Sequence, residues 1–249
     1  MTGSEYALQI VGLTKSFGGL PVTRNVSLAI KPGERRLIIG PNGAGKTTLF
    51  NQITGELAPD AGRIKLFGRD ITRSKPQQRA HLGMSRTYQI LTLFKDDDLE
   101  HNIALGLLGL RGARWDMLRP LSAYGEIKRE ALRVLGLVGL EHQARQPVSA
   151  IAYGEKRRVE IAMALSQNPK VLLLDEPLAG LSAPEREAVK ALINSIGRGT
   201  TVVMIEHDMD TALDMAETVT LLHYGEVLVD GERDMVVRHE KTLEVYLGH

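Results

Sequence analysis

The fold is decided by the stretch Arg36-Leu37-Ile38-Ile39-Gly40-Pro41-Asn42-Gly43-Ala44-Gly45-Lys46-Thr47. Within it, the full pattern G-x-x-x-x-G-K-[ST] runs from Gly40 to Thr47. The apolar run before the pattern predicts a strand, and a helix is expected from Lys46 onward. Glycines let the backbone wrap closely around a compact anion, so that successive N–H groups point inward. The first turn of a helix adds the positive end of its dipole. A strand, a glycine-rich loop and a helix in this order therefore predict a phosphate-binding loop.

The Lys-Thr pair that closes this loop has its own chemistry. We expect the Lys46 ammonium to reach the β- and γ-phosphates of a nucleotide, and the Thr47 hydroxyl to ligate Mg²⁺. A glycine-rich turn before a helix is the alternative, and the position of the match between a strand and a helix favours the phosphate loop. The residues expected to contact nucleotide here are Gly40, Pro41, Asn42, Gly43, Ala44, Gly45, Lys46, Thr47 and Thr48.

Two carboxylates follow a second apolar run. Val171 to Leu174 is too hydrophobic to be half exposed, which predicts a central strand of a parallel sheet, and Asp175 and Glu176 come directly after it. Asp175 can hold the Mg²⁺ that bridges the phosphates, directly or through water. Glu176 can polarise a water in line with the γ-phosphate. An acidic pair that only caps the next turn is the alternative, and the upstream loop favours the catalytic interpretation.

The remaining chain alternates between strand and helix patterns, with one interruption. From Leu91 to about Val148 helical patterns such as Tyr124 to Leu137 replace the strands, which predicts an inserted helical lobe. Outside it, repeated strand–helix order predicts a doubly wound α/β core with its ligand at the C-terminal ends of the strands. The other expected strands are Ala7–Leu13, Val26–Ile30, Arg63–Phe67, Met84–Tyr88, Thr201–Ile205, Val219–Leu222 and Glu226–Val229, and the other expected helices are Ala183–Ile196, Met209–Ala216 and two closing segments.

Composition narrows the class of partner. The 249 residues carry 31 basic and 30 acidic side chains, a net charge of +1, so nucleic acid is not expected as the main partner. There are no cysteines, which fits a reducing compartment. Met1 to Tyr6 lacks the pattern of a signal peptide, and Ile103 to Leu110 is far shorter than a membrane span. Any membrane role is therefore expected to depend on a partner already in the membrane.

Five further motifs follow a fixed order. They are Lys15-Ser16-Phe17-Gly18-Gly19, Arg86-Thr87-Tyr88-Gln89, Ile151-Ala152-Tyr153-Gly154-Glu155, Ala179-Gly180-Leu181-Ser182 and Glu206-His207-Asp208. With the phosphate loop and the acidic pair, this ordered series resembles the ABC ATPases over nearly the whole chain. Taken singly, Phe17 could be a core aromatic, Gln89 a surface amide and His207 a histidine at a helix start.

The resemblance implies a fold. It is an α/β P-loop NTPase with a RecA-like core and mixed sheet, an N-terminal antiparallel β subdomain and an inserted α-helical subdomain. The chain would form one ABC ATPase domain, 1–249. The core with its β subdomain would comprise residues 1–90 and 159–249, and the helical signature subdomain residues 91–158.

The resemblance also assigns roles. Lys46, Gln89, Glu176 and His207 would be catalytic, with His207 hydrogen-bonded to the γ-phosphate. Thr47, Gln89 and Asp175 would hold Mg²⁺, and Phe17 would stack on the adenine of ATP. The signature residues Ala152, Tyr153, Gly154 and Glu155 would meet the ATP of a second subunit, chiefly through backbone N–H groups at a helix N-terminus. Two positions depart from the family pattern, because Ala152 stands where serine is common and Ser182 where aspartate is common.

The implied function is ATP hydrolysis coupled to transport. The chain would pair with a second ATPase subunit, as a homodimer or heterodimer, and dock on transmembrane permease subunits at the cytoplasmic face of the membrane, with a solute-binding protein in the complex. Subfamily traits, such as Arg158-Val159-Glu160-Ile161-Ala162 and Tyr246-Leu247-Gly248, resemble the branched-chain amino-acid uptake ATPases. The alternative is an ATPase of lipid or lipopolysaccharide export, or of soluble iron–sulfur assembly.

One apolar cluster bears on coupling to the membrane. Leu91, Leu93 and Phe94 follow Gln89 closely, where a loop would be expected to be polar. They could pack the helical lobe against the core, or line a groove for a short helix of a transmembrane subunit. Both interpretations remain open from the sequence.

Overall fold

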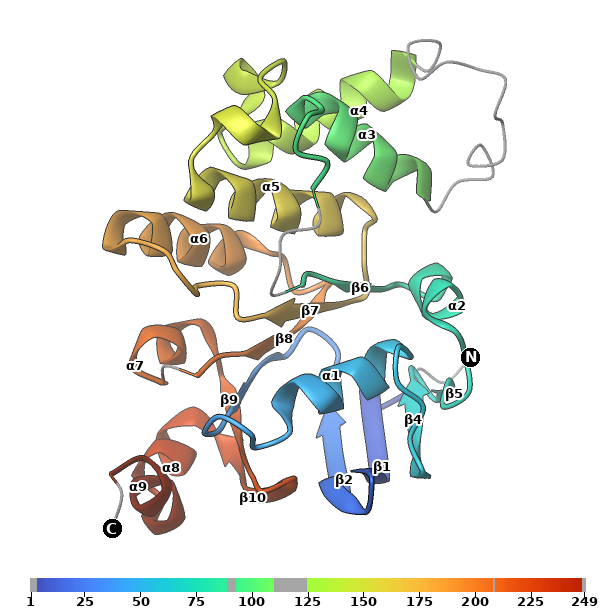
Figure 1. Ribbon diagram of the computed structural model, residues 1–249, viewed down its shortest axis with the longest axis vertical. Coiled ribbons are helices and arrows are strands. Elements are labelled where there is room, and N and C mark those ends of the chain that lie inside the picture. The colour runs from blue at the N-terminus through green and yellow to red at the C-terminus, as the bar shows by residue number, and fades with distance from the viewer. Residues whose placement is uncertain (1–3, 89–92, 110–124, 208, 248–249) are drawn as a thin grey trace. The chain divides into compact units, whose positions relative to one another are not determined.

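The computed structural model describes residues 4–88, 93–109, 125–207 and 209–247 (Figure 1). These residues form two compact units. The core unit comprises Met1–Arg86, Lys170–Pro177 and Ile196–His249, and the helical unit comprises Thr87–Pro169 and Leu178–Ser195. Helix α6 belongs to the helical unit although it lies outside the range 91–158, and the predicted subdomain limits stay a prediction.

The core unit contains a six-stranded sheet in the order β10-β9-β3-β8-β7-β6. Strand β10 is antiparallel to β9, and the other neighbours are parallel, so the predicted mixed sheet is confirmed. Strand β7 lies between β8 and β6, one place from the edge, whereas the sequence predicted a central position. All five of its residues are nevertheless buried. The strands are β3 (Arg35–Ile39), β6 (Met84–Arg86), β7 (Val171–Asp175), β8 (Thr201–Ile205), β9 (Thr218–His223) and β10 (Glu226–Glu232).

A second, antiparallel sheet of the core unit has the order β2-β1-β4-β5 and confirms the predicted β subdomain. Strands β1 and β2 join through Gly18 and Gly19, whose φ angles of 55° and 86° fit a two-residue hairpin turn. This turn places Phe17 at the hairpin tip, paired with Leu20. The strands are β1 (Leu8–Phe17), β2 (Leu20–Ile30), β4 (Ala61–Leu66) and β5 (Arg69–Asp70).

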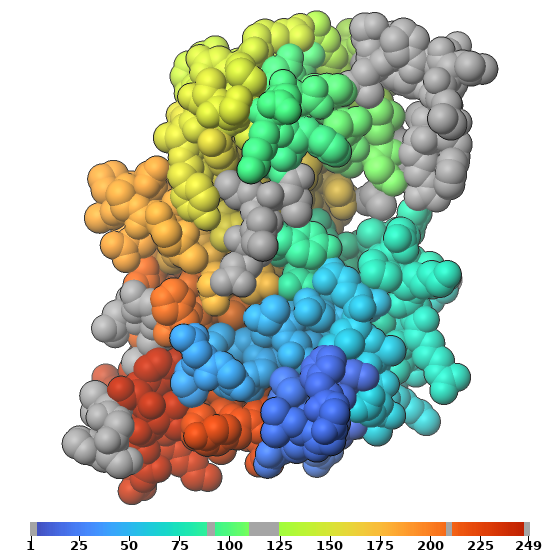
Figure 2. All heavy atoms as spheres, viewed as in Figure 1, coloured from blue at the N-terminus to red at the C-terminus, as the bar shows by residue number. Residues whose placement is uncertain are grey.

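Helix α1 (Lys46–Thr54) fills the space between the two sheets (Figure 1). Leu49, Phe50 and Ile53 join one apolar cluster with buried residues of both sheets. On the face in Figure 2, the light-blue atoms of α1 and its preceding loop border the dark-blue β1–β2 segment. Arg79 of α2 (Pro76–His81) donates to the Gln52 and Ile53 carbonyls at the end of α1, and burial lowers its pKa to about 10. The helix that follows the phosphate loop is thus fixed along its length.

The helical unit packs α3, α4, α5 and α6 together. Helix α5 packs against each of the other three, and a Cβ at Gly106 of α3 would stand 2.5 Å from Met163 of α5, so α3 and α5 approach closely. The expected helix Tyr124–Leu137 is found from Gly125, and Tyr124 lies outside the described residues. The elements are α3 (Leu99–Gly109), α4 (Gly125–Leu137), the 3₁₀ turns η3 (Glu141–Gln143) and η4 (Val148–Ala150), α5 (Tyr153–Ser166) and α6 (Ala183–Ser195).

The C-terminal part of the core unit corrects one predicted helix. Instead of running from Met209 to Ala216, α7 spans Met209–Ala212 and continues as the 3₁₀ turn η5 (Leu213–Met215). The helix stops because Ala216 is already extended and Glu217 donates its N–H to the Arg35 carbonyl, next to β9. The chain then closes with α8 (Arg233–Arg238) and α9 (Glu240–Leu247). Within the described residues, no helix has the length and apolar character that a bilayer span requires.

Candidate nucleotide-binding site

The phosphate loop lies between β3 and α1, where the sequence predicted it. Its glycines are required by the packing at two points. A Cβ at Gly40 would overlap the Leu222 carbonyl oxygen, and one at Gly45, whose φ is 99°, would stand 2.6 Å from the Val22 carbonyl oxygen. A Cβ at Gly43 would meet no atom within 4 Å, so the loop is packed at its ends and open in its middle.

Lys46 points back into this loop. Its Nζ donates to the Gly40 carbonyl at 2.7 Å and to the Pro41 carbonyl at 3.1 Å. Burial lowers the pKa of Lys46, while the carboxylates of Glu176, Asp175 and Glu206 act in the opposite direction. The cation is therefore held by neutral oxygens among negative charges, which leaves it able to exchange carbonyls for phosphate oxygens. Thr47 is exposed beside it at the first turn of α1.

The acidic pair lies at the end of β7 in the same core unit. Asp175 is buried, and its Oδ2 accepts a 2.6 Å hydrogen bond from Nη2 of Arg86, the last residue of β6. Glu176 is half-buried with φ at 46°, and its N–H donates to the Ile205 carbonyl at 3.0 Å. A left-handed glutamate is an uncommon conformation that surrounding structure must support, and such residues concentrate at functional sites.

Two residues of this cluster were not identified as site residues from the sequence. Glu206 is a buried carboxylate that acts on Lys46 together with Asp175 and Glu176, and the sequence marks it only as an acidic neighbour of His207. The sequence places Arg86 only in the segment before Gln89. The sequence does show a basic residue at the end of one strand and an acidic residue at the end of another. This indicates an ion pair only if β6 and β7 are known to be neighbours.

Two further predicted residues of the core unit, Phe17 and His207, are exposed. Phe17 is 50% exposed, with Lys15 Nζ 5.7 Å from its ring centroid, so it is not a core aromatic. His207 is also exposed, and its Nδ1 lies 3.9 Å from Glu206 Oε2. Gln89 lies outside the described residues. The adenine-stacking and γ-phosphate roles of Phe17 and His207 stay predictions.

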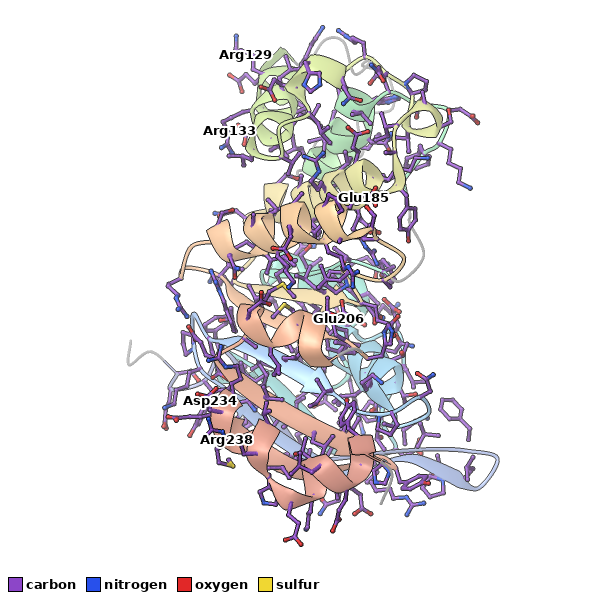
Figure 3. The ribbon with its side chains drawn as sticks, turned by 90° about the vertical axis from the view of Figure 1, so that its left-hand side faces the viewer. Arg129, Arg133, Glu185, Glu206, Asp234 and Arg238 are labelled. Carbon is purple, nitrogen blue, oxygen red and sulfur yellow. The ribbon has the colours of Figure 1, made fainter. Side chains whose placement is uncertain are left out.

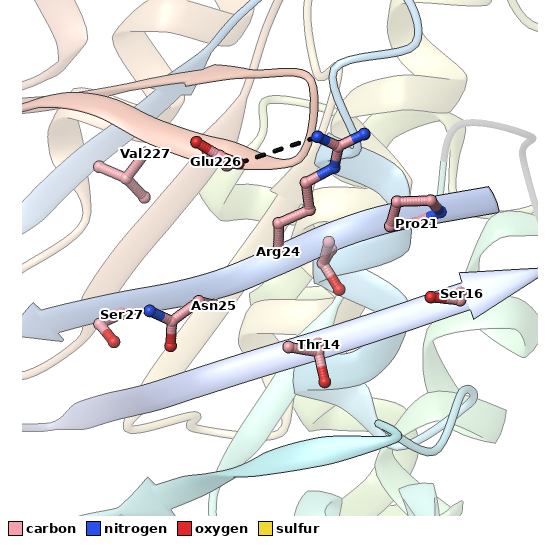
Figure 4. Close-up of a pocket in the computed structure, with 9 residues that line it drawn as sticks. Thr14, Ser16, Pro21, Arg24, Asn25, Ser27, Glu226 and Val227 are labelled. Atoms are coloured by element: carbon pink, nitrogen blue, oxygen red, sulfur yellow. Dashed lines mark ion pairs between the residues drawn. The ribbon is translucent and has the colours of Figure 1, made fainter. Parts of the chain in front are cut away.

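A polar cavity of about 750 Å³ lies between β1, β2 and β10 (Figure 4). An ion pair joins Arg24 and Glu226 across it, with 3.9 Å between Nη1 and Oε1. Among the described residues, its lining includes none of those predicted to contact nucleotide, so the phosphate loop is a separate feature. The lining residues are Thr14, Ser16, Pro21, Thr23, Arg24, Asn25, Ser27, Glu226 and Val227.

The signature residues lie in the helical unit at the beginning of α5. Ala152 is the residue before the helix, and its N–H donates to Glu155 Oε2 at 2.9 Å. Tyr153 is exposed and packs beside Gly180. Gly154 is buried, and its N–H already donates to Glu185 Oε1 at 3.0 Å.

Glu185 joins the beginnings of two helices (Figure 3). It lies in the first turn of α6, and its Oε2 accepts from the Ser182 N–H at 2.9 Å and from the Ser182 hydroxyl at 2.6 Å. The Ser182 hydroxyl, then the Ser182 and Gly154 amides, lower the pKa of Glu185. The spacing Ser-x-x-Glu from 182 to 185 is a helix-start signature, so the sequence contained a signal for this contact.

Comparisons with known proteins agree with this architecture. The sequence profile of the ABC transporter family matches residues 23–179. The chain is 34% identical to the high-affinity branched-chain amino acid transport ATP-binding protein BraF of Pseudomonas aeruginosa, over 98% of this chain and 99% of that one. An ABC transporter cassette solved in its ADP conformation aligns with a TM-score of 0.86 and 29% identity over both full chains. A dimeric cassette in a post-hydrolysis state, bound to ADP and Pi, aligns with a TM-score of 0.78 and 25% identity over 91% of this chain and 98% of that one.

The fold and the site define a P-loop ATPase, with a glycine-rich loop after β3 and carboxylates at the end of β7, which lies two places away in the same sheet. The chain belongs to the ABC transporter family and is one of its ATP-hydrolysing cassettes.

Proposed function

We propose that this cassette binds Mg·ATP on its phosphate loop, closes onto a second cassette and powers uptake of amino acids, branched-chain or other, through partner membrane subunits. The observation that carries the proposal is the position of the Lys46 ammonium inside an open loop, among the carboxylates of Asp175, Glu176 and Glu206. The identity to BraF over 98% of the chain supports the class of substrate.

Hydrolysis would be shared among residues of the core unit. Lys46 would exchange its two carbonyl partners for phosphate oxygens, and Phe17 would stack on the base. Glu176 would accept a proton from the attacking water, and His207 would donate to the γ-phosphate. Exchanging neutral carbonyls for charged oxygens strengthens the hydrogen bonds of the ammonium, which favours nucleotide binding.

The residues present fit a magnesium ion shared with substrate. Mg²⁺ is usually held by one or two protein oxygens together with phosphates and waters. The described residues contain no cluster of three or more metal-binding side chains, and they do contain the exposed Thr47 hydroxyl and the Asp175 carboxylate. When bound, the ion would neutralise charge on the phosphates. Gln89, the third predicted ligand, lies outside the described residues.

The signature would act on the nucleotide of the partner cassette, as in the family pattern. Gly154 can offer its N–H to a phosphate only after Glu185 releases it, because that N–H is engaged at 3.0 Å. Closure of the dimer would therefore exchange one anion, a carboxylate, for another, a phosphate oxygen, at the N-terminus of α5. The dimeric relative bound to ADP and Pi supports pairing of this chain in the same manner.

Mixing two inactive variants tests this arrangement. Lys46→Ala removes the phosphate contact in its own loop, and Gly154→Asp puts a negative charge at the signature. If the signature serves the opposite nucleotide, a mixed dimer has one intact composite site, and ATPase activity rises on mixing well above either variant alone. No gain on mixing, with both proteins folded by circular dichroism, would contradict the proposal that the signature acts in trans.

The substrate class needs the membrane partners. In proteoliposomes with its permease and solute-binding subunits, the cassette should hydrolyse ATP faster when leucine is supplied on the outer side than when a sugar is supplied. A permease partner would place the cassette at the cytoplasmic face of the membrane. Stimulation only by lipid or lipopolysaccharide would favour the export alternative, and normal function without any membrane subunit would favour the iron–sulfur alternative.

A further inference from the structure

Arg86 occupies a fixed position between β7 and α1. Its Nη2 donates to Asp175 Oδ2 at 2.6 Å, while its Nη1 donates to Asn51 Oδ1 at 2.7 Å and lies 3.2 Å from Glu56 Oε2. The guanidinium carbon also lies 5.7 Å from the centroid of the buried Phe50 ring. The two sides of one rigid cation thus contact a strand end and the helix that follows the phosphate loop.

The pair between Arg86 and Asp175 is almost completely removed from solvent. The Arg86 side chain is 6% exposed and the Asp175 side chain 2%. Asp175 also belongs to the group of carboxylates, with Glu176 and Glu206, that act on Lys46. Removing one partner of a buried ion pair leaves an uncompensated charge, so the guanidinium and the carboxylate hold each other in place.

We propose that Arg86 is a positioning residue for magnesium binding. Its guanidinium ties Asp175 to α1, which begins with Lys46 and Thr47. The two side chains proposed to hold the ion, Thr47 on α1 and Asp175 on β7, then keep a constant spacing. This inference rests on the metal role of Asp175 in the proposed function.

Arginine suits this position better than lysine because its planar fork serves two partners at once. One nitrogen faces Asp175 and the other faces Asn51, with Thr54 Oγ1 at 3.3 Å. A lysine would keep the positive charge, but its single nitrogen cannot replace two separate nitrogens that face opposite partners. Arg86→Lys therefore separates the charge of the residue from its ability to link β7 with α1.

Metal binding measured without turnover tests the proposal. Mn²⁺ stands in for Mg²⁺, and its binding to the complex with the non-hydrolysable analogue AMP-PNP is followed by electron paramagnetic resonance. Changes in residues that orient a metal ligand typically weaken metal affinity about 10–100-fold. We expect Arg86→Lys to raise the Mn²⁺ Kd about tenfold, while the affinity for AMP-PNP in EDTA stays within about twofold of the wild type.

A second variant tests the same link independently, in case Arg86→Lys does not fold. Asn51→Ala keeps the pair between Arg86 and Asp175 and removes one anchor on α1, so the Mn²⁺ Kd should rise in the same direction, by less than in Arg86→Lys. Arg36→Lys is the matched control, because Arg36 is a buried arginine of the same sheet whose acidic partners are Glu34 and Asp230. Its Mn²⁺ Kd should equal that of the wild type.

The outcomes separate this inference from the proposed function. If Asp175→Asn loses Mn²⁺ binding but Arg86→Lys and Asn51→Ala bind it like the wild type, the positioning role is overturned and the metal role of Asp175 stands. If Asp175→Asn also binds Mn²⁺ normally, both are overturned. An equal loss in Arg36→Lys would mean that any buried arginine of this sheet has the same effect, which also overturns the proposal.

Discussion

Lys46 is held in the phosphate loop by two carbonyl oxygens, at 2.7 and 3.1 Å, rather than by the carboxylates around it. Its replacement by alanine should weaken ATP binding strongly. A hydrogen bond to a charged group is worth about 1.5–3 kcal/mol, so the Kd for ATP should rise about 10–100-fold. Titration with a fluorescent ATP analogue measures it. Lys31→Ala, at an exposed turn, is the matched control, and unchanged affinity in Lys46→Ala would refute the phosphate-loop assignment.

Glu176 combines a left-handed backbone with a half-buried carboxylate beside Asp175. Glu176→Gln keeps the shape of the side chain and removes the base. ATP should still bind, hydrolysis should fall by roughly 100-fold or more, and the ATP-bound dimer should accumulate in gel filtration. His207→Ala should lower hydrolysis more than binding. Normal phosphate release by Glu176→Gln would move the role of base to another residue, with His207 the first candidate.

Single residues also mark where inference from the sequence stops. The spacing of Gly40, Lys46 and Thr47 predicts the loop because each residue type has a local reason to be there. Arg86 and Glu206 have no such local pattern. Their places beside Asp175 and Lys46 depend on β6 lying next to β7, and on Glu206 following β8 in the same sheet. Side-chain partners across a sheet require the strand order, which periodicity does not contain.

At the scale of elements, the sequence predicts where strands and helices occur more reliably than it predicts which of them lie next to one another. The run Val171 to Leu174 indicates a fully buried strand, and β7 is one, but burial on both faces does not distinguish a middle strand from the next one outward. The helix expected from Met209 fails at its end for a similar reason. Its residues suit a helix, but Ala216 is extended and the Glu217 N–H donates to the Arg35 carbonyl beside the sheet.

Helices α5 and α6 are linked at their beginnings by Glu185, and this link should oppose dimer closure. Glu185→Gln weakens the acceptor at the Gly154 N–H, so the ATP-dependent dimer should form at a lower ATP concentration. Losing the helix-start contacts to Ser182 should cost about 1 kcal/mol, or about 2–4 °C in melting temperature. Analytical ultracentrifugation across an ATP titration, in the Glu176→Gln background, measures the midpoint.

Ser182→Ala is the control for this link. It removes the hydroxyl that donates to Glu185 Oε2 and leaves the contact between Glu185 and Gly154 in place. It should lower the melting temperature by a similar amount without moving the dimerisation midpoint. If Glu185→Gln dimerises at the same ATP concentration as the wild type, the carboxylate does not compete with phosphate for the signature amide.

The whole molecule can act in transport only if some surface contacts a membrane partner. The apolar cluster after Gln89 is the candidate, and its two described residues, Leu93 and Phe94, differ in exposure. Leu93 is buried, which fits packing within the helical unit, whereas Phe94 is 60% exposed. Asn102 of α3 holds the Phe94 backbone on both sides, accepting from its N–H at 2.8 Å and donating to its carbonyl at 3.1 Å. An exposed ring on a fixed backbone suits a docking contact. Leu91 lies outside the described residues.

We therefore expect the two described residues of the cluster to respond differently. Leu93→Asp should cost at least about 2 kcal/mol, which lowers the melting temperature by roughly 4–8 °C. Phe94→Ala should change stability by no more than about 0.5 kcal/mol and ATP binding not at all, yet reduce co-purification with the permease and transport. Leu137→Ala is the matched control, because Leu137 is equally exposed on α4. Normal docking by Phe94→Ala would remove Phe94 from the docking surface. An equal loss in Leu137→Ala would do the same, because the partner would then not distinguish this ring from another exposed apolar side chain of the helical unit.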